Sequence, residues 1–286
     1  MDRGRLPGMR ISVVHSTVYR YASPVYLEPH TFRLRPREDG CQRLEQYALQ
    51  ISPAPTGQTQ CLDHDGNVII QAWFSGLTQE LALYTAFQIE TLRDNPFDFL
   101  LSPCDRQLPM QYPDPFRAPL ASYVPAVPPG PVRAFAESLA EECGMQTMAF
   151  LSALNLRLNQ TTRQVVRHEG APLPPEETLR TREGSCRDLA VLFCAACHSL
   201  GIAARFVSGY ERDSALEDEG DLHAWAEVYF QGGGWRGYDP SRGLAVGTSH
   251  VPVAAAANPL LAAPVTGTFR GQSRAQMHFS ISMQVK

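Results

Sequence analysis

The chain has 286 residues, a length that predicts about two domains. With 44% hydrophobic residues it can bury a substantial core, and a formal net charge of −4 argues against a broad basic surface for nucleic acid. The seven cysteines are scattered and odd in number, which argues against a disulfide framework and favours a reducing compartment. The N-terminus lacks the apolar core of a signal peptide, and the weakly charged stretch 189–204 is too short for a membrane span. We therefore predict a cytoplasmic protein without a nucleic-acid or membrane partner.

Residues 1–95 are predicted to form a β domain. Apolar and polar positions alternate in MRISVVHSTVYRY, which is rich in β-branched and aromatic residues. Further strand-like runs are TFRLRP, LEQYALQIS, NVIIQAWFSG and ELALYTAFQIE. Asp65-Gly66-Asn67 predicts a turn between two of them. The spacing of these short strands indicates a sandwich or small barrel with a structural or substrate-positioning role.

Residues 96–130 are predicted to connect this domain to a second one. Ten prolines lie from Pro96 to Pro131, and proline is incompatible with a regular helix or a central strand. The segment also contains more aromatic residues than a free linker needs, so we expect it to pack against both domains. These aromatic residues are Phe97, Phe99, Tyr112, Phe116 and Tyr123.

A catalytic domain is predicted over residues 131–286. Pro131 suits the first turn of a helix, a second helix is expected from Thr147 to about residue 165, and a third, largely buried one lies in SCRDLAVLFCAACHSLG. Ser185 and Asp188 fit a capping box, which makes Ser185 the N-cap and Cys186 the first helical residue.

This position gives the thiol of Cys186 a chemical role. The free N–H groups and the dipole at a helix N-terminus favour the thiolate form and could stabilise an oxyanion after attack on a carbonyl. Gly184 leaves room beside the sulfur. The alternative, a cap followed by a buried structural cysteine, is equally compatible with this segment alone.

Two partner residues lie in DLHAWAEVYFQGGGWRGYDPSRG. Strict alternation predicts a strand from His223 to Phe230, the three glycines predict a turn, and Pro240 ends the second strand at Asp239. His223 and Asp239 then lie at the same open end of a hairpin, where a carboxylate could orient an imidazole. A structural histidine and an ordinary Asp-Pro turn are the alternatives.

Three neighbouring residues are candidates for substrate binding. Glu227 shares a strand face with His223, and Trp225 and Trp235 could form walls of a cleft. A structural ion pair for Glu227 and hydrophobic cover by the two tryptophans are the alternative interpretations.

Metal and haem sites are not expected. Cys194-Ala-Ala-Cys197-His198 fits the attachment motif of c-type haem, but it lies within an apolar helix and no export signal accompanies it. A zinc site from these residues and Cys186 lacks a completing pair, and His64 between Asp63 and Asp65 is predicted to be a solvated turn residue.

The motifs GSCRDLA, HAWAEVYF and GWRGYDPS, in this order, resemble the core of the transglutaminase-like superfamily, and they place its cysteine, histidine and aspartate at Cys186, His223 and Asp239. HSTVYRY and DHDGNVI are similar to the N-terminal β domain of its bacterial branch, so the resemblance covers nearly the whole chain. AAAANPLLAAPVTG stands where many bacterial relatives carry a GRDY-like stretch.

The resemblance implies an α+β fold without a metal or organic cofactor: a β-sandwich-like N-terminal domain, then a cysteine-protease-like domain with a helix packed on an antiparallel sheet. It implies that Cys186 is the nucleophile, His223 the general base and acid, and Asp239 the residue that orients His223. The substrate would be a peptide or protein amide that forms a thioester intermediate. We favour a protease or amidase; a true protein-glutamine gamma-glutamyltransferase and a catalytically silent binding or scaffold protein are the alternatives. The oligomeric state is left open.

Overall fold

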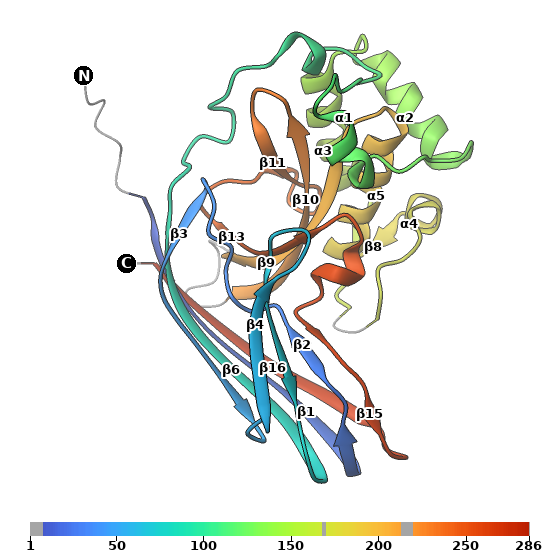
Figure 1. Ribbon diagram of the computed structural model, residues 1–286. Coiled ribbons are helices and arrows are strands. Elements are labelled where there is room, and N and C mark those ends of the chain that lie inside the picture. The colour runs from blue at the N-terminus through green and yellow to red at the C-terminus, as the bar shows by residue number, and fades with distance from the viewer. Residues whose placement is uncertain (1–7, 168–169, 213–219, 286) are drawn as a thin grey trace, which may run out of the picture.

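The first sheet of the protein is built around two long strands (Figure 1). The computed structural model describes residues 8–167, 170–212 and 220–285. β1 (Arg10–Leu27) pairs antiparallel with β6 (Thr78–Thr91), and β6 pairs in turn with β3 (Gln42–Ser52). The other edge of β1 pairs with β15 (Phe269–Arg270) and β16 (Ala275–Val285).

A smaller antiparallel sheet packs on the first. Its strands, in spatial order, are β14 (Val265–Thr266), β2 (His30–Phe32), β5 (Val68–Trp73) and β4 (Gly57–Leu62). Buried apolar side chains of both sheets form one core, so the predicted sandwich is confirmed. The sequence did not predict β4, because GQTQCL lies at a sheet edge, is largely exposed and has no apolar alternation.

The last strand returns to the first sheet. β16 pairs with β1 from Ile11 opposite Val285 to Tyr21 opposite Ala275. The predicted domain limits assign this strand to the catalytic domain, whereas the structure places it in the N-terminal sheet. Alternation identifies a strand but not its partner, and these two strands lie at opposite ends of the chain.

The central sheet carries the second half of the fold. Its strands, in spatial order, are β12 (Leu244–Ala245), β11 (Gly234–Asp239), β10 (Gly220–Phe230), β9 (Ala204–Arg212) and β13 (His250–Ala256). All the pairings in this sheet are antiparallel.

Helices cover one face of the central sheet, and the first sheet packs on the other. The helices are α2 (Pro131–Glu142), α3 (Thr147–Thr161), α4 (Pro175–Thr181) and α5 (Cys186–Ser199). α5 lies directly on β9 and β10 (Figure 1). On the opposite face, Tyr210 and Val251 pack against Ile11 and Phe87 of the first sheet. The predicted α+β architecture, with a helix on an antiparallel sheet, is therefore confirmed.

The proline-rich connection contacts both halves, as predicted. It contains η1 (Pro103–Asp105), α1 (Arg117–Leu120) and η2 (Ala121–Tyr123). The Tyr123 hydroxyl donates to Asp65 at 2.5 Å, and its ring packs edge-on against Trp235. None of the described helices is long and apolar enough to cross a lipid bilayer.

The predicted turn at residues 65–67 also joins the two halves. Gly66 adopts a φ of 77°, a conformation that favours glycine. The Asn67 side chain donates to the Ala255 carbonyl at 2.9 Å and accepts from the Ala255 N–H at 2.8 Å. His64 is exposed beside Asp65, in agreement with its prediction as a solvated turn residue.

Candidate active site

Cys186 is the first residue of α5, as the capping pattern predicted. Ser185 has extended backbone geometry, and its N–H and hydroxyl donate to Asp188 Oδ2 at 2.7 and 2.8 Å. The first N–H groups of a helix have no acceptor within the helix, so the N–H groups beside this sulfur can bind a developing negative charge. Cys186 is half-buried and lines a cavity.

Asp188 does more than cap the helix. Its fully buried carboxylate also accepts from Arg167 and from the Leu173 N–H, at 2.8 and 2.7 Å. These hydrogen bonds to Asp188 connect the loop before α4 to the start of α5. Gly184 serves this packing: a Cβ there would lie 3.0 Å from the Asp188 Cβ, so its small size is required against Asp188, not beside the sulfur as the sequence suggested.

His223 and Asp239 meet as the predicted hairpin requires. β10 and β11 pair with Ala226 opposite Tyr238, which brings the Asp239 carboxylate to the His223 ring. His223 Nε2 lies 2.7 Å from Asp239 Oδ2. Cys186 lines the same cavity as His223 and is close enough to raise the pKa of its ring. The structure therefore brings together the three residues predicted to be catalytic.

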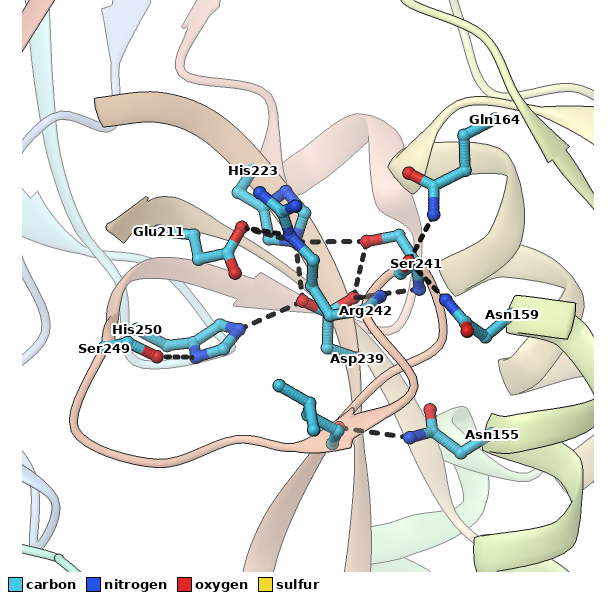
Figure 2. Close-up of polar contacts among 11 residues, drawn as sticks. Asn155, Asn159, Gln164, Glu211, His223, Asp239, Ser241, Arg242, Ser249 and His250 are labelled. Carbon is cyan, nitrogen blue, oxygen red and sulfur yellow. Dashed lines mark hydrogen bonds and ion pairs between the residues drawn. The ribbon is translucent and has the colours of Figure 1, made fainter. Parts of the chain in front are cut away.

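Asp239 is held by more partners than the sequence indicated (Figure 2). Its Oδ2 also accepts from His250 Nε2 at 3.0 Å. Its Oδ1 accepts from the N–H and the hydroxyl of Ser241, at 2.9 and 2.6 Å, and from the Arg242 N–H at 3.2 Å. Asp-Pro-Ser is a turn signal that could have identified Ser241. His250 comes from β13, next to β9 in the sheet, and no local motif marks it.

The loop after Asp239 is fastened to α3 (Figure 2). Asn159 donates to the Ser241 carbonyl at 2.6 Å, and Gln164 in β7 (Arg163–Gln164) donates to the same oxygen. Asn155 donates to the Leu244 carbonyl at 3.1 Å. β7 also pairs with β8 (Glu183–Gly184), the segment before Ser185, so one network positions both Asp239 and Cys186.

The surroundings of His223 and Asp239 favour a charged pair, in which His223 is protonated and Asp239 is ionised. Burial alone would disfavour charge on His223, but its hydrogen bonds to Asp239 and Cys186, and their negative charges, raise the pKa of His223 to about 10. Burial also opposes ionisation of Asp239, but the hydrogen bonds from His223 and His250 hold the pKa of Asp239 well below its ordinary value. His223 is thus a protonated group beside the sulfur, able to donate a proton to a leaving amine.

Glu211, His223, Asp239 and His250 form a cluster with metal-ligand chemistry. Their candidate ligand atoms lie within 4.8 Å of one another. Each acid already has a cationic or donor partner, because Asp239 pairs with the two histidines and Glu211 pairs with Arg242 at 2.8 Å. These internal pairs balance the buried charges, so the cluster fits a hydrogen-bonded network better than a metal centre.

The three predicted substrate-binding residues do not line the cavity in the described part of the chain. Trp225 is fully buried and packs edge-on against His250. Glu227 pairs with Arg205 at 2.6 Å, and the Arg205 guanidinium lies over the Trp235 ring. The structure therefore favours the alternative interpretations of these residues. The two tryptophans contribute to hydrophobic packing, and Glu227 forms an ion pair.

The haem-like motif lies within the core. Cys194 and Cys197 are buried in α5, and His198 Nε2 lies 3.1 Å from the Ala204 carbonyl oxygen. All seven cysteines are free thiols.

The cavity around Cys186 and His223 has a volume of about 800 Å³. It is bounded by the catalytic core, by the segment from η3 (Pro259–Ala262) to Val265, and by β1 and β16 of the first sheet. The charged residues among its described lining are Arg167, Arg187, Arg242 and the protonated His223, and no carboxylate is among them.

Comparisons with known proteins bear on the family and the fold of the chain. Residues 133–240 match the transglutaminase-like superfamily, and residues 11–90 match the bacterial transglutaminase-like N-terminal region. "Uncharacterized protein ML0607" of Mycobacterium leprae is 26% identical over 270 residues, which are 92% of this chain and 94% of the relative. A crystal structure of "a Putative Cysteine Protease from Cytophaga hutchinsonii" superposes with a TM-score of 0.68 at 17% identity, covering 98% of both chains. That likeness shows that the fold is shared along the whole chain.

Proposed function

The chain belongs to the transglutaminase-like superfamily, in the arrangement that carries the bacterial N-terminal region, and on this premise we propose that it is a cysteine-dependent acyl-transfer enzyme of the protease or amidase type. The observation that carries the proposal is the continuous chain of contacts from the Cys186 thiol through the His223 ring to Asp239 Oδ2. The nucleophile of this chain lies at a helix N-terminus and inside a cavity.

The first half-reaction forms a thioester. The Cys186 thiolate attacks the amide carbonyl carbon, and the carbonyl π electrons move to the oxygen, next to the free N–H groups of α5. When the tetrahedral intermediate collapses, the C–N bond breaks and His223 donates its proton to the leaving amine. Asp239 keeps the ring oriented and stabilises its charged form.

The second half-reaction releases the acyl group. His223, now neutral, accepts a proton from water as the water oxygen attacks the thioester carbonyl. The C–S bond then breaks, and the products are a carboxylic acid and the Cys186 thiolate beside protonated His223. The enzyme returns to its starting charges, and no cofactor is required by this balance.

The charges of the cavity support water over an amine as the acceptor. A lysine side chain carries a positive charge until it is deprotonated, and the charged residues in the described lining, which are three arginines and the protonated His223, are positive as well. Like charge disfavours the approach of a lysine but not that of neutral water. These charges favour hydrolysis over gamma-glutamyl transfer.

The test uses carboxymethylated casein and a fluorescent primary amine, with Cys186→Ala as the control. We expect new N-termini, or ammonia beyond the one molecule that each incorporated amine displaces, in amounts that exceed the incorporated amine, and all of these signals should disappear in Cys186→Ala. Incorporation that exceeds hydrolysis at millimolar amine would establish a transferase instead. If the wild type and Cys186→Ala release equal amounts, the enzymatic proposal is wrong.

A further inference from the structure

One wall of the catalytic cavity comes from the N-terminal domain. Thr17 and Tyr19 of β1 and Met277 and Phe279 of β16 line the cavity together with Cys186 and His223. These residues are cross-strand neighbours: Thr17 pairs with Phe279 and Tyr19 pairs with Met277. The sandwich therefore presents a continuous two-strand surface to the site. Its β1 residues Thr17 and Tyr19 lie about 115 residues before the start of the core match at residue 133.

The side chains that face the cavity on this wall are mainly apolar. Along β16, Met277 and Phe279 are half-buried, whereas His278, between them, and Ser280, after them, point to the other side and are exposed. Leu260, from the η3 segment, extends the same lining and leaves 55% of its surface exposed. We name Tyr19, Leu260, Met277 and Phe279 the apolar wall.

Polar contacts fix this wall relative to the catalytic residues. His15 on β1 lies 2.9 Å from the Tyr210 hydroxyl on β9 and 2.7 Å from the Thr17 hydroxyl. The Ser208 hydroxyl on β9 donates to the Ala262 carbonyl at 2.5 Å, which holds the η3 segment. Both anchors lie on the strand next to the one that carries His223. Because these hydrogen bonds fix the wall before a substrate binds, the wall can select substrates by shape and polarity.

We propose that the apolar wall is the specificity site of the enzyme and that its substrate is a polypeptide with aliphatic or aromatic side chains next to the attacked carbonyl. This inference rests on the proposed function, because it takes Cys186 as the nucleophile. An acyl chain that reaches the sulfur enters the cavity and meets Met277 and Phe279, and an apolar side chain there removes apolar surface from water. A polar side chain of the same size loses its hydration at Leu260, Met277 and Phe279, whose side chains offer it no hydrogen-bond partners.

The test compares two covalent probes of matched size. Acetyl-Leu-Leu-Leu vinyl sulfone and its Asn-Asn-Asn counterpart differ chiefly in polarity, since leucine and asparagine have similar shapes. In the labelling step the thiolate sulfur bonds to the vinyl carbon β to the sulfone, which is attached to the peptide Cα, the C=C π electrons move to the carbon next to the sulfone, and this carbanion takes a proton. Rates at Cys186 are measured by peptide mass spectrometry and divided by the iodoacetamide rate of the same variant, which removes differences in thiol reactivity.

In the wild type we expect the leucine probe to label Cys186 at least about tenfold faster than the asparagine probe. Met277→Asn combined with Phe279→Asn should reduce this preference to near one, and the milder Phe279→Ala should reduce it in part. His278→Ala and Ser280→Ala, on the opposite face of β16, are the matched controls and should keep the wild-type preference. Thermal melting verifies that each variant is folded.

Equal rates for the two probes in the wild type would overturn the inference, as would an unchanged preference in the folded double variant. The failure of the proposed function has a different signature. In that case iodoacetamide would not single out Cys186 among the thiols, and neither probe would label it.

Discussion

His250 donates its Nε2 hydrogen to Asp239 Oδ2 at 3.0 Å, the same oxygen that holds His223 at 2.7 Å. A ring nitrogen that donates to a carboxylate carries the proton, so this geometry fixes the tautomer of His250. Its other nitrogen lies 3.0 Å from the Ser249 hydroxyl, which can donate to it. Asp239 is thus clamped between a histidine that touches the thiol and one that does not.

Removing His250 should weaken the positioning of His223 by Asp239. His250→Leu leaves Asp239 Oδ2 with one donor fewer, and a hydrogen bond to a charged group contributes about 1.5–3 kcal/mol. In this variant we expect the rate at which iodoacetamide labels Cys186 to fall by about tenfold or more. His250→Gln keeps a hydrogen-bond donor and should retain part of the wild-type rate. His278→Ala, on exposed β16 surface, is the control. Full reactivity in folded His250→Leu would show that His250 does not position the pair.

The charge of Asp239 should control the protonation of His223. Because the pKa of His223 is raised to about 10, its imidazole should stay protonated at pH 8, where a free histidine is neutral. Asp239→Asn removes the negative charge of the group that accepts the hydrogen bond from His223. The midpoint of the His223 titration should therefore fall by at least about one pH unit, and turnover should fall by about two to four orders of magnitude. Histidine ring NMR across pH 5–11 measures the midpoint. An unchanged midpoint would contradict the ion-pair description.

Asp188 should matter for stability as well as for reactivity. Asp188→Ala removes the acceptor for Ser185, Arg167 and the Leu173 N–H, and it leaves these donors without their partner. We expect the free energy of unfolding to fall by about 2–4 kcal/mol in urea titrations. Glu183→Ala, which breaks an exposed pair with Arg163, should change it by less than about 1 kcal/mol. Equal losses in both variants would refute the anchoring role.

His15 should make the contact between the two halves sensitive to acid. Burial lowers the pKa of His15 from 6.5 to about 4. As the pH falls from 6.5 towards 4, the unfolded chain binds a proton that the folded chain excludes, so stability decreases as the pH drops. The full effect is about 3 kcal/mol. His15→Gln should show a shallower decrease in the free energy of unfolding across this range, and an identical slope would contradict the assignment.

Much of this site could be predicted from local patterns, for physical reasons. The start of α5 follows from Ser185 and Asp188 because capping is a contact between residues three apart. The meeting of His223 and Asp239 follows from hairpin geometry. Both relationships involve short stretches of chain, where periodicity and turn chemistry determine the structure.

The remaining features depend on contacts distant in sequence. His250 reaches Asp239 because β13 pairs with β9, and β16 reaches the cavity because it pairs with β1 at the other end of the chain. Neither pairing leaves a local signal. Alternation predicts that Trp225 and Glu227 share a strand face with His223, but it does not predict what packs on that face, and Trp235 lies on the neighbouring strand.

Competitive alkylation tests most directly whether Cys186 is the activated nucleophile. Burial raises the pKa of Cys41 to about 12 and also raises the pKa values of Cys104, Cys143, Cys194 and Cys197, so these thiols should react slowly. Cys61 is exposed and serves as the internal reference. With limiting iodoacetamide at pH 7, peptide mass spectrometry should show Cys186 labelled at least about tenfold faster than Cys61, and His223→Ala should abolish this advantage. Labelling of Cys186 at or below the rate of Cys61 in the wild type would contradict the account.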